Sequence, residues 1–121
     1  MLETTVKLAK LMIETHNTTD VYTIAENESI RIITNDHVEL AGHIAWVIKA
    51  YGRKTLIVTG KINEMQKQSV VARAIGCFDI FLYDEDDTLM GLHENPSTFE
   101  QQATLNYASI FLSKSAVPAF A

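Results

Sequence analysis

Three clusters of polar residues have types and spacing that suit chemistry, and the first is the loop Thr59-Gly60-Lys61. This loop directly precedes an expected helix that Asn63 begins, and backbone N–H groups at a helix start suit an anion. It lacks both the upstream glycine and the Ser or Thr after the lysine that a Walker A phosphate loop requires. The pattern favours an ordinary tight turn between strand and helix, with an anion site as the alternative.

The second cluster is the acidic run Asp84-Glu85-Asp86-Asp87, which follows an apolar segment. Carboxylate oxygens are the ligands that Mg²⁺ prefers. These four acids are consecutive, however, and are not spaced so that their side chains converge on one ion. A solvated acidic turn is the favoured interpretation, and no metal site is predicted.

The third cluster is the pair Glu39 and His43, four residues apart on an expected helix. No third group stands at a suitable spacing, so a weak surface pair is favoured over a catalytic one. The single cysteine, Cys77, cannot form an internal disulfide and is interpreted as a small buried apolar residue in a reducing compartment. No catalytic residue and no cofactor is predicted, and enzymatic activity is uncertain and on balance not expected.

Composition narrows the classes of protein further. A chain of 121 residues with 47% hydrophobic content suits one domain with one core. The net charge is -5, and the ten Lys and Arg are scattered, which argues against binding to nucleic acid. No run approaches the roughly 20 apolar residues of a membrane span, and the start of the chain does not match a signal peptide. We expect a soluble cytoplasmic protein that is not bound to a membrane.

The elements that position these residues centre on an expected βαβ unit from Lys54 to Asp87. Short apolar runs at 56–58 and 80–83 suit strands covered on both faces. Between them, Asn63 and Gln66 have the spacing of a capping box, and Gly76 provides a helix stop.

The rest of the chain supplies further elements around this unit. An amphipathic helix is expected over residues 3–16, its apolar stripe packed on its own domain or, as the alternative, on a second copy. Residues 21–25 and 30–34 suggest a hairpin, and a helix is expected from Asn35 or Asp36 to Tyr51. Residues 88–92 suggest a short edge strand or a turn, and Ser97 with Glu100 predicts a final helix to about residue 113. The predicted fold is a single small α/β domain with a mixed sheet, a hairpin plus βαβαβα, an extra N-terminal helix and a tail over 114–121.

This layout predicts where a ligand would bind, at the rim of the sheet formed by the carboxyl ends of its parallel strands. Right-handed crossovers would make the strands near residues 30, 56 and 80 parallel, so that their carboxyl ends lie together. The candidate ligand-binding residues at that rim are Asp36, Thr59, Gly60, Lys61, Asn63 and Asp84.

A second candidate surface is an interaction surface around Trp46, the only tryptophan. On the expected helix over residues 36–51, its ring lies opposite the apolar stripe. Either the N-terminal helix or a loop covers it, which is favoured, or it anchors a partner, as tryptophan often does at interfaces. The candidate interaction residues are His43, Trp46, Glu64, Leu105 and Leu112.

The expected order of elements over residues 20–112, with Asp36 opening the first helix of the unit, resembles the STAS domain of bacterial anti-sigma factor antagonists. Where that family has an Asp-Ser-Ser-Gly-type sequence, this chain has Lys61-Ile62-Asn63-Glu64-Met65, and Ser69 lies inside the helix, so no phosphorylation site is carried over. The resemblance implies a non-catalytic module that binds a protein partner or itself. The alternative is an α/β protein, or an enzyme, that binds a small ligand or phosphate at the rim.

Overall fold

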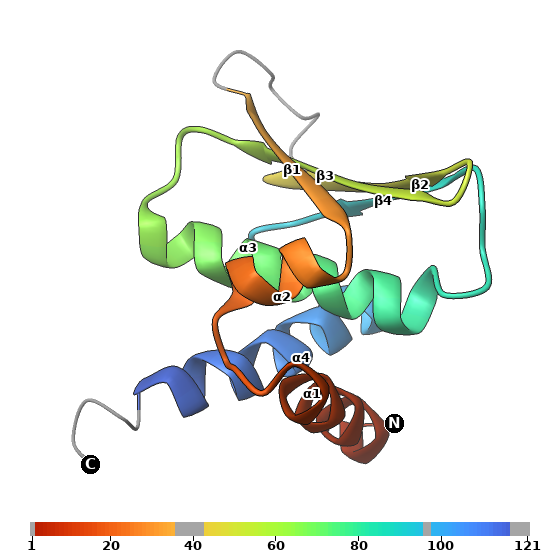
Figure 1. Ribbon diagram of the computed structural model, residues 1–121. Coiled ribbons are helices and arrows are strands. Elements are labelled where there is room, and N and C mark those ends of the chain that lie inside the picture. The colour runs from red at the N-terminus through yellow and green to blue at the C-terminus, as the bar shows by residue number, and fades with distance from the viewer. Residues whose placement is uncertain (1, 36–42, 96–97, 117–121) are drawn as a thin grey trace.

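A four-stranded mixed sheet with helices stacked on one of its faces is the frame of the molecule (Figure 1). The computed structural model describes residues 2–35, 43–95 and 98–116. The sheet has the order β1-β3-β2-β4, in which β1 is parallel to β3, while β2 is antiparallel to both β3 and β4. The predicted class, a single small α/β domain with a mixed sheet, is confirmed. The strands are β1 (Ile30–Asn35), β2 (Ala45–Ala50), β3 (Arg53–Thr59) and β4 (Thr88–Leu92).

The helices form layers beneath the sheet. The middle layer, α2 and α3, contacts β1 and β3, α4 packs against α3, and α1 packs against α4 (Figure 1). The opposite face of the sheet has no helix of the described chain over it (Figure 1). The helical elements are α1 (Leu2–His16), α2 (Val21–Asn27), α3 (Glu64–Gly76), the π-helical turn η1 (Cys77–Phe81) and α4 (Phe99–Ala116).

Several predicted elements are confirmed. The strand expected at 56–58 is part of β3, and residues 88–92 form the edge strand β4. Helix α3 begins with the full capping box of Asn63 and Gln66. The N-terminal helix packs on its own domain, with Leu8, Met12 and Ile13 against the core. At the start of α4 the Thr98 hydroxyl accepts a hydrogen bond from the Gln101 amide at 3.2 Å, whereas Ser97 lies outside the described residues.

The helix expected up to Tyr51 is wrong over its second half, where β2 stands; residues 36–42 lie outside the described residues. Alternation explains the strand, because Ala45 and Val47 are fully buried against the helices while Trp46 and Ile48 point the other way. Tyr51 (φ 53°) and Gly52 (φ 73°) then close a tight hairpin with β3. Two successive positive φ angles are typical of the type I′ turn, which suits the twist of paired strands.

The strand expected at 21–25 is helix α2, so the predicted hairpin with 30–34 is wrong as well. Its start signal is Asp20, whose carboxylate accepts hydrogen bonds from the Tyr22 amide at 3.1 Å and the Thr23 hydroxyl at 2.9 Å. The buried residues follow helical spacing and not the alternation of a strand: they are Val21, Ile24 and Ala25.

The strand expected at 80–83 is also wrong, because the chain continues from α3 directly into η1. Gly76 does not stop the helix, since its φ of −61° is helical. Its role is to allow a close approach: a Cβ at this position would lie 2.8 Å from Cγ of Tyr107 on α4. Only β1 and β3 therefore form the parallel part of the sheet.

The hairpin turn provides a direct test of the fold. In Gly52→Ala the new Cβ meets no atom within 4 Å, so the cost comes from the positive φ alone and should be about 1–2 kcal/mol of unfolding free energy. Tyr51→Asn, at the neighbouring position with positive φ, should stabilise, because asparagine tolerates that conformation better. Urea unfolding of both variants measures this. If Gly52→Ala left the unfolding free energy unchanged, the positive φ assigned to Gly52 in this turn would be contradicted.

Candidate functional site

The loop Thr59-Gly60-Lys61 lies at the carboxyl end of β3, as expected, but its Gly60 and Lys61 backbone amides already donate hydrogen bonds within the protein. The Gly60 amide donates to the Asn35 carbonyl at 3.2 Å, and the Lys61 amide donates to the Thr59 hydroxyl at 3.2 Å. Asn63 caps α3 through Gln66. The favoured interpretation, an ordinary tight turn, fits these contacts.

The predicted convergence of this loop with Asp84 is wrong. The neighbouring Asp86 accepts a hydrogen bond from the Gly52 amide at 3.1 Å, which places the acidic turn at the start of β3. Thr59 to Lys61 follow the other end of the same seven-residue strand. Asp36, the third member, lies outside the described residues. Within the described ranges no group of three or more His, Cys, Asp or Glu is placed to hold a metal ion.

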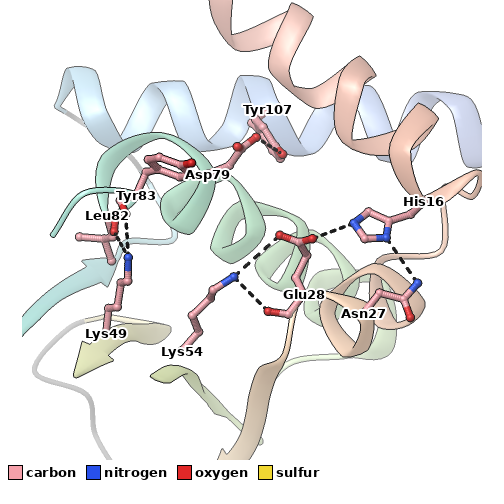
Figure 2. A network of polar contacts seen from close by, with 9 residues as sticks. All are labelled: His16, Asn27, Glu28, Lys49, Lys54, Asp79, Leu82, Tyr83 and Tyr107. Atoms are coloured by element: carbon pink, nitrogen blue, oxygen red, sulfur yellow. Dashed lines mark hydrogen bonds and ion pairs between the residues drawn. The ribbon is translucent and has the colours of Figure 1, made fainter. Parts of the chain in front are cut away.

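At the acidic-turn end of the sheet, a polar network joins the sheet to the helices (Figure 2). Lys49 donates to the Leu82 and Tyr83 carbonyls, both at 2.8 Å, which anchors the segment after η1. Lys54 donates to the Glu28 carbonyl at 3.0 Å, and the Glu28 carboxylate lies 2.9 Å from Nε2 of His16 (Figure 2). Both lysines therefore donate to acceptors within the protein. We interpret the cavity of about 140 Å³ beside them as part of the packing between sheet and helices, and not as a ligand site.

Asp79 on η1 is the titratable group in this region whose environment is most unusual. The Tyr107 hydroxyl donates to its carboxylate at 2.9 Å (Figure 2). Burial raises the pKa of Asp79 above its ordinary value, and the hydrogen bond from Tyr107 opposes this only in part. Nearby, burial raises the pKa of the Cys77 thiol to about 12, which fits the prediction of a buried apolar cysteine and not a reactive one.

A second polar cluster lies between α3 and α4, centred on Arg73, whose exposed fraction is only 2%. Its Nε donates to the Thr104 hydroxyl at 2.9 Å, Nη1 to the His93 carbonyl at 2.8 Å and Nη2 to the Gln101 amide oxygen at 3.0 Å. Burial lowers the pKa of this guanidinium. Sequence reasoning missed Arg73, because nothing in its local pattern separates it from a surface arginine.

Arg73 also lines a cavity of about 140 Å³ between α3, α4 and the start of β2. The walls are mainly aliphatic, and Leu105, one of the predicted interaction residues, belongs to them. The lining residues are Ile44, Ile62, Gln66, Ser69, Val70, Arg73, Glu94 and Leu105.

The third feature is an aromatic cluster on the uncovered face of the sheet. The His43 ring lies 4.5 Å from Trp46 and 4.0 Å from His93, measured between ring centroids. Gly91, directly across from Trp46 on β4, makes room, because a Cβ there would collide with the His43 ring. His43 and Trp46, two of the candidate interaction residues, thus lie in contact at the sheet, and Trp46 belongs to strand β2 and not to a helix.

The predicted interaction residues do not form one surface. The N-terminal helix packs on α4, beneath the sheet, and so does not cover Trp46 (Figure 1). Glu64 accepts a hydrogen bond from the Tyr22 hydroxyl at 2.6 Å, and Leu112 is half-buried on α4. The residues that do surround Trp46, which are Ile48, Ile57 and Leu89, were missed; the alternation in β2 was the signal that could have found them.

Comparison with known proteins places the chain in no family: no family model, no curated protein and no solved structure matches it. The resemblance to STAS domains therefore stays a prediction, and the observed element order differs from the order on which it was based. In the described ranges, every helix is too short or too polar to cross a membrane.

The environment of Asp79 predicts a pH dependence of stability. Its folded pKa lies above the unfolded value of about 4, so the folded protein retains the proton longer, and stability falls as the pH rises through the window between them. Asp79→Asn keeps an acceptor for Tyr107 and removes that loss. The variant should therefore gain stability relative to the original protein as the pH rises, measured by urea unfolding from acid to neutral pH.

Asp84→Asn, in the exposed acidic turn, is the matched control. The difference in unfolding free energy between this variant and the original protein should change little with pH. An Asp79→Asn variant that becomes relatively less stable toward neutral pH would contradict the buried placement of this carboxyl.

Proposed function

We propose that the protein is a non-enzymatic protein-binding module that uses the uncovered face of its sheet. The observation that carries the proposal is an apolar hollow of about 170 Å³ on that face, whose described lining residues are Trp46, Ile48, Ile57 and Leu89. Leu89, the second residue of the edge strand β4, is 60% exposed, which is high for a large aliphatic side chain. Exposed apolar patches of this kind mark interaction surfaces.

Strand register supports a continuous apolar surface. Across the sheet, Ile33 pairs with Ile57, and Ile57 pairs with Trp46. In the adjacent row on the same face, Ile48 pairs with Leu89. Side chains that follow one another across neighbouring strands lie in contact, so these residues form one surface.

The charge of this face indicates what kind of partner fits it. Arg31 and Arg53 are exposed on it, and the strand residues of this face that the structure describes include no Asp or Glu. The whole chain, in contrast, has a net charge of -5. The complementary partner is a protein segment with an aromatic or aliphatic anchor next to acidic residues. Two copies of this chain would bring like-charged arginines into one interface, which disfavours pairing through this face.

The tilted ring contact between His43 and Trp46 supports the proposal from a second direction. A ring held between neighbours loses little conformational freedom when a partner binds, and such preorganised aromatic residues are typical of interface hot spots. Trp46 is therefore the expected anchor point on this side of the interface.

The test uses a displayed library of random peptides selected against the whole protein. Selected peptides should combine an apolar anchor with Asp or Glu, and their binding should shift the emission of Trp46, the only tryptophan. Trp46→Ala should weaken binding by about 2 kcal/mol, roughly 30-fold in Kd, with little change in stability. Arg31→Glu should also weaken peptide binding. The loss of affinity should be larger in low salt than in high salt, because salt screens interactions between exposed charges.

Leu11→Ala is the matched control, since Leu11 is 56% exposed on α1, away from the sheet. It should leave binding unchanged. Selected peptides without acidic residues, binding that ignores Trp46→Ala, or emission that shifts with protein concentration alone would each overturn the proposal.

A further inference from the structure

The cavity that Arg73 lines contains a buried positive charge that forms no ion pair among the described residues. Arg73 is almost fully buried, and its three hydrogen-bond acceptors, from Thr104, His93 and Gln101, are all neutral. Neither of the two ion pairs among the described residues involves it. A buried arginine is ordinarily paired with a carboxylate, because burial of an isolated charge is costly.

The guanidinium also has donors to spare. It carries five N–H groups, and the three observed bonds use one each on Nε, Nη1 and Nη2. One N–H therefore remains on each terminal nitrogen. The N–H groups of a guanidinium bind carboxylate oxygens through strong, charge-assisted hydrogen bonds.

The walls of the cavity define the rest of the ligand. Ile44, Ile62, Val70 and Leu105 supply aliphatic surface, and the volume of about 140 Å³ holds a group of a few heavy atoms. Among the described lining residues, Arg73 is the only Lys, Arg or His, whereas Glu94 is exposed and lies at the same cavity. One positive charge with a carboxylate nearby favours a single negative charge over the two of a phosphate monoester.

We propose that this cavity binds a carboxylate with a short aliphatic body, and that Arg73 is the residue that recognises its charge. A free short-chain acid and the C-terminal carboxylate of a protein share this chemistry. The site is separate from the proposed binding face, because Ile44 and Val70 pack with the core on the helical side of the sheet, opposite Trp46.

The experiment is a pair of NMR titrations of the whole ¹⁵N-labelled protein, with butyrate and with the neutral butyramide. Butyrate should shift the amides of Ser69 and Val70 and the side-chain Nε–H of Arg73, and butyramide should not. A second pair compares an acetylated Ala-Val dipeptide with a free C-terminus with its amidated form. Stronger binding of the free dipeptide than of butyrate assigns the site to a chain terminus, and the reverse assigns it to a free acid.

Arg73→Gln is a poor single test, because Arg73 also holds α3 against α4. Ser69→Leu is the deciding variant: it fills the cavity from its wall, keeps the contacts of Arg73 and should abolish the butyrate shifts. Glu94→Gln should tighten butyrate binding on the order of threefold, because it removes a like charge. Glu100→Gln, exposed on α4 and not part of the cavity lining, is the matched control and should change nothing.

Equal shifts with butyrate and butyramide, no shifts with either carboxylate, or butyrate binding that survives Ser69→Leu would overturn the proposal. None of these results bears on the peptide selection at Trp46, so the two proposals fail separately.

Discussion

The arrangement of α3, α4 and the end of β4 depends on the buried guanidinium of Arg73. Its acceptors come from α4 and from the segment that follows β4. Gln101 extends the network, because its side chain accepts from the His93 amide at 3.0 Å and donates to the Gly91 carbonyl at 2.6 Å. Among the described residues no buried side-chain nitrogen or oxygen lacks a partner. A network in which each buried nitrogen and oxygen has at least one partner specifies one arrangement, since any shift of α4 would leave several of them unpaired.

The same two helices show why all the described helices lie on one side of the sheet. α4 approaches α3 closely because Gly76 leaves space for Tyr107, and α1 then covers α4 and not the sheet. Every described helix is therefore used on one side of the sheet (Figure 1). The alternation in β2 and β3 still places Trp46 and Ile57 on the other side. An apolar face without a helix over it follows from this arrangement, and it gives the proposed binding role its physical basis.

Sequence reasoning found the elements that have local signals. The capping box of Asn63 and Gln66 and the amphipathic pattern of α1 are such signals, and both elements are where they were expected. The segments 21–25 and 80–83 were assigned as strands because short apolar runs do not separate strands from buried helical turns. Asp20 was a usable cap signal for α2, and Tyr51-Gly52 was a usable turn signal for β2. The two candidate sites depend on tertiary contacts: the packing of the His43 ring over Gly91, and the contacts of Arg73 with α4, have no counterpart in any local pattern.

The packing of α1 on α4 joins the two ends of the described chain and so bears on synthesis. A nascent chain makes α1 first, but its partner helix begins only at Phe99. At ordinary elongation rates of about 5–20 residues per second, the apolar stripe of α1 waits on the order of 10 s for that partner. During this interval Leu8 and Met12 lack the α4 residues of the core against which they pack. The hairpin of β2 and β3, in contrast, pairs neighbouring segments and is complete long before α4 emerges from the ribosome. Chaperones that bind exposed apolar helices would therefore encounter this protein at its first helix.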